Sequence, residues 1–164
     1  MKLSLINESS QLTLYKGVSE YGGISGWPTH EEGSTGVTVP GFLSNYEVAR
    51  TYSQPSLVSG PESSSMIIRV NISKNSIEDR TTEFFEWART NQNNKPDISI
   101  GFPEKWRNDS TIWTVKNSGS GHDTHDILDG ASFVYCGVKL KYFVVSFYQN
   151  ESDWEADDAV KSYY

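Results

Sequence analysis

The chain has 164 residues, of which 36% are hydrophobic and 13% aromatic, and it carries a formal net charge of −7. Disordered chains are poor in aromatic residues, so this composition excludes disorder of the whole chain and predicts a folded domain with a buried core. The negative charge argues against a surface for the phosphate backbone of nucleic acid, which needs clustered Lys and Arg.

Localisation is suggested by three features of the sequence. The single cysteine, Cys136, excludes an intramolecular disulfide, and we expect it to be a small buried residue of a strand. The first residues, 1–7, lack the apolar run of a signal peptide, and no apolar stretch approaches the length of a membrane span. We therefore expect a cytoplasmic protein.

The first quarter of the chain predicts two strands and a helix. Apolar and polar residues alternate over 11–18, which indicates a strand. Residues 19–40 are rich in Gly and Pro and predict a long loop without regular structure. A short strand is expected at 41–44, and Asn45 suits the N-cap of a short helix that ends before Pro55.

The middle of the chain predicts two further strands and a longer helix. Residues 66–72 are apolar at alternate positions, as in a strand with one buried face. Ser76 is the expected N-cap of a helix near 77–89. A polar connection follows over 91–110, and residues 111–116 read as a strand.

The last third contains the strongest β signal. Residues 131–148 are rich in Val, Phe and Tyr, and Gly137 in their midst predicts a turn or bulge between two strands. We expect one domain over 1–150 and a solvated acidic tail over 151–164. Short strands with few helices predict an α+β fold with two packed sheets or a split barrel.

Four segments of the chain follow one another in a characteristic order. They are residues 14–17 (Leu-Tyr-Lys-Gly), residues 41–52, residues 66–72, and the pair Asp129-Gly130 followed by residues 139–145. This order resembles the phage- and toxin-type ADP-ribosyltransferases. The resemblance implies an ADP-ribosyltransferase-like split β-sandwich with an extended cleft that binds NAD as the substrate.

The first segment corresponds to the family's strand that ends in an aromatic residue, a basic residue and glycine, here Tyr15, Lys16 and Gly17. The resemblance implies that Gly17 lets the backbone approach the nicotinamide carboxamide. It implies that Lys16 contacts the ribose or a phosphate of NAD. Lysine keeps the charge of the family's Arg but lacks the planar fork of a guanidinium.

The second segment corresponds to the family's aromatic residue, Ser/Thr-rich strand end and following helix. The resemblance implies that Ser44 hydrogen-bonds the catalytic group or NAD, and that Tyr52 or Tyr46 lines the nicotinamide pocket. The implied catalytic positions are Lys16, Ser44 and Lys141. The implied NAD-binding residues are Tyr15, Lys16, Gly17, Phe42, Ser44 and Tyr52.

The third part of the pattern differs in its charge. The family has a catalytic Glu directly before an aromatic-rich strand, and here Lys141 occupies that position. A lysine opposes the positive ribose of the transition state, which a carboxylate stabilises. Either the carboxylate comes from Asp129, Glu47 or Glu151, or the alignment is shifted, or the protein does not transfer ADP-ribose.

A pair of histidines, His122 and His125, lies beside Asp123 and Asp126 in a Gly/Ser-rich stretch. Two histidines three residues apart can contribute to a metal site or provide a general base. The only other histidine is His30, so we expect no metal site and interpret the stretch as a polar capping segment.

Two functions are expected from these observations. The first is an NAD- or nucleotide-binding ADP-ribosyltransferase-like protein that modifies a host protein. The alternative is a catalytically lapsed binding or inhibitor module of the same fold, for example a phage-type anti-defence protein, which binds a nucleotide or engages a basic partner through the acidic tail. A metal-assisted enzyme using His122 and His125 ranks third. Neither membrane association nor direct nucleic-acid binding is expected.

Overall fold

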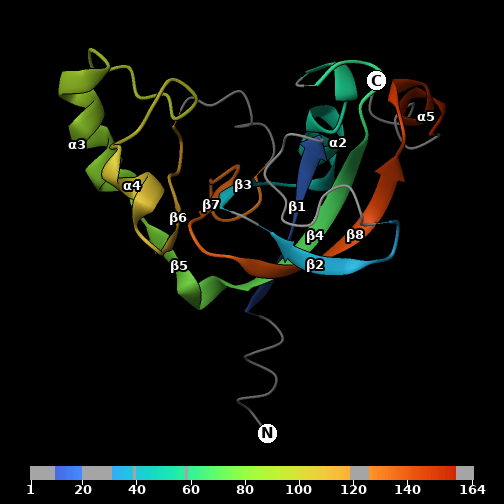
Figure 1. Ribbon diagram of the computed structural model, residues 1–164. Coiled ribbons are helices and arrows are strands. Elements are labelled where there is room, and N and C mark those ends of the chain that lie inside the picture. Colours follow the sequence, from blue (N-terminus) through green and yellow to red (C-terminus); the bar gives the residue numbers. More distant parts are fainter. Residues whose placement is uncertain (1–9, 20–30, 39, 58, 119–125, 158–164) are drawn as a thin grey trace, which may run out of the picture. The chain divides into compact units, whose positions relative to one another are not determined.

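The computed structural model describes residues 10–19, 31–38, 40–57, 59–118 and 126–157 (Figure 1). These residues form two four-stranded sheets and a few short helices. The α+β class expected from the sequence is therefore confirmed.

The chain divides into two compact units, each assembled from three segments. Unit 1 comprises Met1–Leu12, Pro40–Ser44 and Ser73–Val138. Unit 2 comprises Thr13–Val39, Asn45–Ile72 and Lys139–Tyr164.

Unit 2 contains sheet A, whose strands follow the order β1-β4-β8-β2. The strands are β1 (Gln11–Ser19), β2 (Thr35–Thr38), β4 (Ser65–Ser73) and β8 (Leu140–Tyr148), and β8 is antiparallel to both of its neighbours. The alternate apolar side chains of β4 are buried as predicted, because one face of the strand is turned to a core.

The helices of unit 2 are short and begin at asparagine caps. The helix α2 (Tyr46–Tyr52) begins as predicted at Asn45, whose side chain accepts a hydrogen bond from the backbone N–H of Val48. A 3-10 helix, η1 (Pro55–Leu57), follows it. The helix α5 (Glu151–Ala156) begins at Asn150, which caps the N–H of Asp153.

Unit 1 contains sheet B, whose strands follow the order β3-β7-β6-β5. The strands are β3 (Gly41–Leu43), β5 (Ile77–Asp79), β6 (Ile112–Thr114) and β7 (Val134–Cys136). The helices of this unit are α3 (Thr81–Asn91) and α4 (Lys105–Asn108), with a 3-10 turn, η2 (Lys74–Ser76), before β5.

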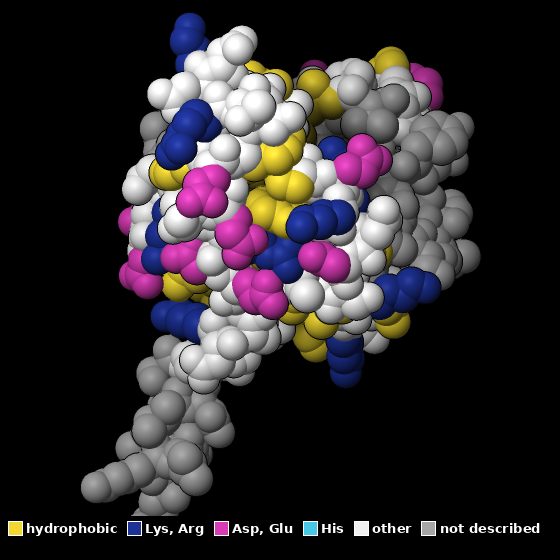
Figure 2. All heavy atoms as spheres, turned by 90° about the vertical axis from the view of Figure 1, so that its left-hand side faces the viewer, with side chains coloured by type: hydrophobic (Ala, Val, Ile, Leu, Met, Phe, Trp, Pro, Cys, Tyr) yellow, Lys and Arg dark blue, Asp and Glu magenta, His cyan; other side chains and the backbone are white. Residues whose placement is uncertain are grey.

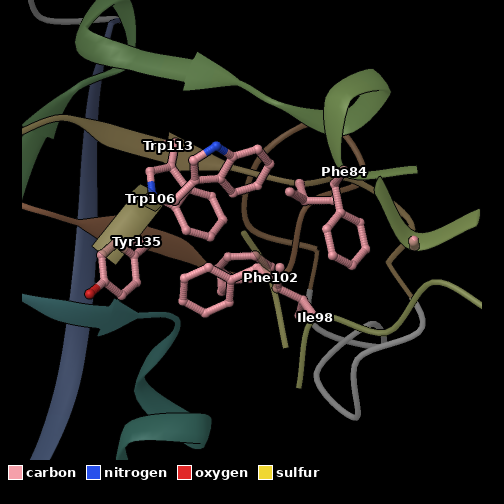
Figure 3. Packing of buried hydrophobic residues seen from close by; sticks show 9 residues of the cluster. Phe84, Ile98, Phe102, Trp106, Trp113 and Tyr135 are labelled. Atoms are coloured by element: carbon pink, nitrogen blue, oxygen red, sulfur yellow. The ribbon is translucent and has the colours of Figure 1, made fainter. Parts of the chain in front are cut away.

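The core of unit 1 is dominated by aromatic side chains (Figure 3). Phe84 and Ala88, four residues apart on α3, present one apolar stripe to it. The ring of Trp113 packs edge-on against Trp106 at 5.0 Å and stacks on Tyr135 at the same centroid distance. Such ring pairs add about 0.5–1.5 kcal/mol each beyond their buried area.

One predicted helix start is wrong. Ser76 caps no helix, since its Oγ donates to the carbonyl of Ser73 within a 3-10 turn. The next three residues form β5, which pairs in parallel with β6 through Ile77 and Ile112. The helix α3 begins four residues later than the N1 position implied by Ser76, because this tertiary pairing holds 77–79 extended and Asp79 accepts hydrogen bonds from Thr81 instead.

Two predicted irregular stretches contain regular structure. The stretch 19–40, predicted to be a loop, includes β2, which pairs with β8 in the register Thr35↔Phe143. The polar stretch 91–110 includes α4, which places Trp106 in the core of unit 1. In both cases a partner distant in sequence determines the conformation.

The break predicted at Gly137 is confirmed. A Cβ on Gly137 would lie 2.6 Å from the carbonyl oxygens of Asp109 and Thr111, so only glycine fits between β7 and β8. Its N–H donates to the Thr111 carbonyl at 2.7 Å. Cys136 beside it is buried in β7, as predicted.

Candidate functional site

The six residues expected to bind NAD are divided between the two units. Tyr15, Lys16, Gly17 and Tyr52 belong to unit 2, whereas Phe42 and Ser44 belong to unit 1.

Gly17 lies where β1 and the end of α2 approach each other closely. A Cβ on Gly17 would lie 2.1 Å from the carbonyl oxygen of Ala49 and 2.6 Å from the backbone nitrogen of Ser53. A side chain of any size would therefore force the strand and the helix apart. The close approach that requires glycine here is to the backbone of α2.

Tyr15 lies on the same face of β1 as Gly17, because side chains alternate along a strand. Its ring meets the ring of Tyr46 edge-on at a centroid distance of 5.3 Å, and both rings pack on the small core around Ala49 and Trp154. Tyr52, at the end of α2, is 50% exposed. Of the expected aromatic residues in unit 2, Tyr52 is thus the more accessible to a ligand.

In unit 1, Ser44 and Phe42 differ in what they leave accessible. Ser44 is buried, and its Oγ donates to the carbonyl oxygen of Ser132 at 2.6 Å. Phe42 is 41% exposed, while its inner edge meets the rings of Tyr135 and Phe133. Ser44 therefore joins two segments of unit 1, and Phe42 closes the aromatic core and shows one side to solvent.

Lys141 of β8 has an exposed side chain on sheet A. Its Nζ is 5.5 Å from the ring centroid of Phe143, two residues along β8. The guanidinium carbon of Arg69, on the neighbouring strand, is 5.3 Å from the same centroid. Among the described residues, no carboxylate forms an ion pair with either cation. The local charge around Phe143 is therefore positive.

Lys16 and Lys141 lie on opposite faces of sheet A. On β4, Asn71 points to the same face as Arg69, which pairs with Phe143 of β8. The side chain of Asn71 accepts a hydrogen bond from Thr13 of β1 at 2.9 Å, so Thr13 lies on this face as well. Lys16 is three residues from Thr13, so regular alternation turns it to the other face, together with the buried Leu14 and Val18. The two lysines thus do not share one face of the sheet.

The three alternative carboxylates occupy separate places. Glu47 is exposed in the first turn of α2. Asp129 lies in the left-handed conformation, with φ 46°, in a turn of unit 1. Glu151, in α5, accepts hydrogen bonds from the hydroxyl of Ser56 and the amide of Gln54, which lower the pKa of its carboxyl.

Unit 2 contains a buried arginine that the sequence analysis did not identify. Arg50 of α2 is 1% exposed, and its guanidinium lies between the rings of Tyr46, Tyr148 and Trp154. It donates to the hydroxyl of Tyr148, which in turn donates to Asp157 at 2.6 Å. A short helix rich in polar residues carries no signal that one of its arginines is enclosed.

A second arginine, Arg80, organises unit 1. Its Nη1 forms an ion pair with Asp109 at 3.0 Å, and its Nη2 donates to Glu78 and Thr111. The guanidinium carbon lies 5.1 Å from the ring centroid of Trp106. These contacts satisfy its charge within the unit, so Arg80 is a structural residue.

The surface of unit 1 that carries α3 and α4 has charges of both signs around an apolar patch (Figure 2). The guanidinium carbon of Arg107, in α4, lies 4.4 Å from the ring centroid of Phe102. Acidic side chains are interspersed with the basic ones across the view. This mixture does not form the uniform positive field that a phosphate-rich ligand favours.

The histidines His30, His122 and His125 all lie outside the described residues. Within the described part of the chain, no three His, Cys, Asp or Glu side chains gather as metal ligands would. No helix in that part is long and apolar enough to span a membrane.

Comparisons with protein-family models, curated proteins and solved structures found no match to this chain.

Proposed function

We propose that this protein binds a nucleotide, with NAD as the leading ligand, and does not transfer ADP-ribose. The proposal begins from the order of motifs that resembles the ADP-ribosyltransferases. The α+β arrangement of two four-stranded sheets is compatible with that resemblance. The fold family and the ligand remain part of the proposal.

The observation that carries the proposal is the positive charge at Lys141. Cleavage of the nicotinamide–ribose bond builds positive charge on the ribose, which a carboxylate stabilises. Lys141 and Arg69, both against the ring of Phe143, offer charge of the opposite sign. Cations beside an aromatic ring suit the binding of an anionic ligand with a flat base.

The alternative, an inhibitor that engages a basic partner through its acidic tail, is less well supported. Two carboxylates of this segment are already bonded inside unit 2: Glu151 to Ser56 and Gln54, and Asp157 to Tyr148. These two carboxylates are partly engaged within the unit, which makes them less available to a basic partner.

The proposal is tested by calorimetry of the full chain with NAD and ADP-ribose, combined with an assay of nicotinamide release. We expect binding without measurable release. Lys141→Glu should raise nicotinamide release if the resemblance places this residue correctly, and Lys139→Glu is the matched control for the added charge. The absence of binding at millimolar ligand would overturn the proposed function, and rapid release by the natural sequence would overturn its non-catalytic part.

A further inference from the structure

An aromatic ring flanked by two cations lies on a partly exposed region of sheet A, on the face that α2 covers near Gly17. Phe143 of β8 faces Arg69 of β4 on one side and Thr35 of β2 on the other. In the next row, Lys141 faces Val37, which is 45% exposed. We call these five residues the Phe143 platform.

The backbone holds the platform in a fixed arrangement. Side chains that face each other across antiparallel strands have Cβ atoms about 4.5–5.5 Å apart. Residues two apart on one strand point to the same face, so Lys141 and Phe143 lie side by side. Two adjacent strands, β4 and β8, thus present one ring, one guanidinium and one ammonium together.

The cations of the platform are not neutralised by a carboxylate, in contrast to three other cations of the described residues. Arg50, Arg80 and Lys116 each form an ion pair with a carboxylate. Lys141 and Arg69 have no such partner among the described residues, although the whole chain has a net charge of −7. A local positive site on an acidic protein is electrostatically matched to an anion.

We propose that the Phe143 platform is the binding site of a phosphate-bearing nucleotide. The base stacks on the surface formed by the Phe143 ring and the planar guanidinium of Arg69, and the ammonium of Lys141 turns from the ring to the phosphate. An exposed cation–π contact contributes only about 0.5–1 kcal/mol. A charge-assisted hydrogen bond to phosphate is the stronger interaction, so the turn of Lys141 is favourable.

The size of the platform indicates a mononucleotide or dinucleotide. Proteins that hold single-stranded nucleic acid stack successive bases on several aromatic side chains along a basic groove. The platform has one ring and two cations, which is enough for one base and its phosphate. The net charge of −7 further disfavours a polyanion.

This inference rests on the proposed function, because it locates the nucleotide on this chain. The test is calorimetry of the full chain with AMP, adenosine, ADP-ribose and NAD. The variants are Phe143→Leu, which keeps an apolar side chain without the ring, and the exposed Lys141→Gln. Lys139→Gln is the matched control, since Lys139 is exposed and lies just before β8. Circular dichroism checks that each variant is folded.

We expect Phe143→Leu and Lys141→Gln each to weaken AMP binding on the order of tenfold, as the loss of one stacking or phosphate contact does. Lys139→Gln should leave the affinity unchanged, and Lys141→Gln should not affect adenosine, which lacks a phosphate. Natural affinity in both variants would overturn the platform and leave the proposed function standing. Failure of the natural chain to bind AMP, ADP-ribose or NAD would overturn both.

Discussion

At the scale of single residues, Gly17 shows how one motif residue supports two interpretations. Its place after Tyr15 and Lys16 resembles a nucleotide-binding strand end. The space that its missing side chain leaves is filled by the backbone of α2. Packing therefore explains this glycine without a ligand, and the sequence alone does not contain that information.

A Gly17→Ala substitution should destabilise unit 2. The new Cβ would lie 2.1 Å from the carbonyl oxygen of Ala49, a rigid backbone atom that cannot turn aside. Overpacking of this kind costs about 1–3 kcal/mol in the free energy of unfolding, measured by urea titration. Gly101→Ala is the control. Its added Cβ would meet the Trp87 ring at 3.9 Å, an ordinary van der Waals distance, so this substitution should change the stability little.

Tyr148 should make the protein sensitive to alkali. Burial, and secondly its hydrogen bond to Asp157, raise the pKa of this phenol above the ordinary value of 10.0. A group whose pKa is raised on folding stabilises the native state fully below its unfolded pKa, and this contribution is lost as the pH rises beyond it. Stability should therefore fall above about pH 10.

The Tyr148→Phe variant isolates this effect. Tyr135 and Tyr142 also have pKa values raised by burial, so the comparison must be between variant and natural chain. In thermal melts from pH 8 to 11, the melting temperature of the variant should fall less with rising pH than that of the natural chain. The variant should be less stable at pH 8, because Arg50 loses its bonded hydroxyl. Parallel curves would show that the pKa of Tyr148 does not differ between the folded and unfolded states.

At the scale of elements, α5 shows that an acidic segment can be part of a core. The sequence predicted a solvated tail from residue 151 onward. The described part of it forms a helix whose Trp154 is buried, with its Nε1 donating to the hydroxyl of Ser53 at 2.9 Å. This amphipathic helix was not predicted because it is too short to show a clear hydrophobic periodicity among its acidic residues.

Replacing Trp154 by Ala should cost about 3–5 kcal/mol in the free energy of unfolding, the usual cost of removing a buried aromatic side chain. The substitution removes packing on Ala49 and Ile67 as well as one ring from the surroundings of Arg50. Denaturant titration followed by circular dichroism measures this loss. Glu155→Ala on the exposed side of α5 is the control. Equal stability of both variants would mean that α5 is not held in place by Trp154.

At the scale of the whole molecule, the two units are not two consecutive domains. The chain enters each unit in three separate segments. Sheet B, for example, takes β3 from the first half of the sequence and its other strands from 73–138. A sequence scan for domain boundaries finds no linker here, because no single point of the chain separates the units.

A fragment comprising residues 73–138 should therefore fold poorly. It lacks β3, which pairs with β7 in the register Phe42↔Tyr135 and brings the buried Leu43. Without β3, the backbone N–H and C=O groups of β7 that pair with it would be left without partners. Without Leu43, the aromatic cluster would be exposed to water. Near-ultraviolet circular dichroism, which reports ordered aromatic packing, should be weak for the fragment and strong for the full chain. A native-like spectrum of the fragment would show that β3 is dispensable.

Features of the fold that have local causes could be predicted from the amino-acid sequence. The strands with alternating apolar residues, the Asn45 cap of α2 and the break at Gly137 follow from side-chain periodicity and turn chemistry. The α+β class follows from the density of short strands.

Only the tertiary structure decided the features that depend on distant partners. Residues 77–79 are a strand because β6 lies beside them, and β2 forms because β8 offers a free edge. Arg50 is bonded to Tyr148, which lies 98 positions further along the chain (148 − 50). Arg69 pairs with Phe143, which lies 74 positions further along (143 − 69). Local propensity is worth tenths of a kcal/mol per residue, roughly, whereas a buried contact or ladder pairing is worth about one or more, so the distant partner prevails.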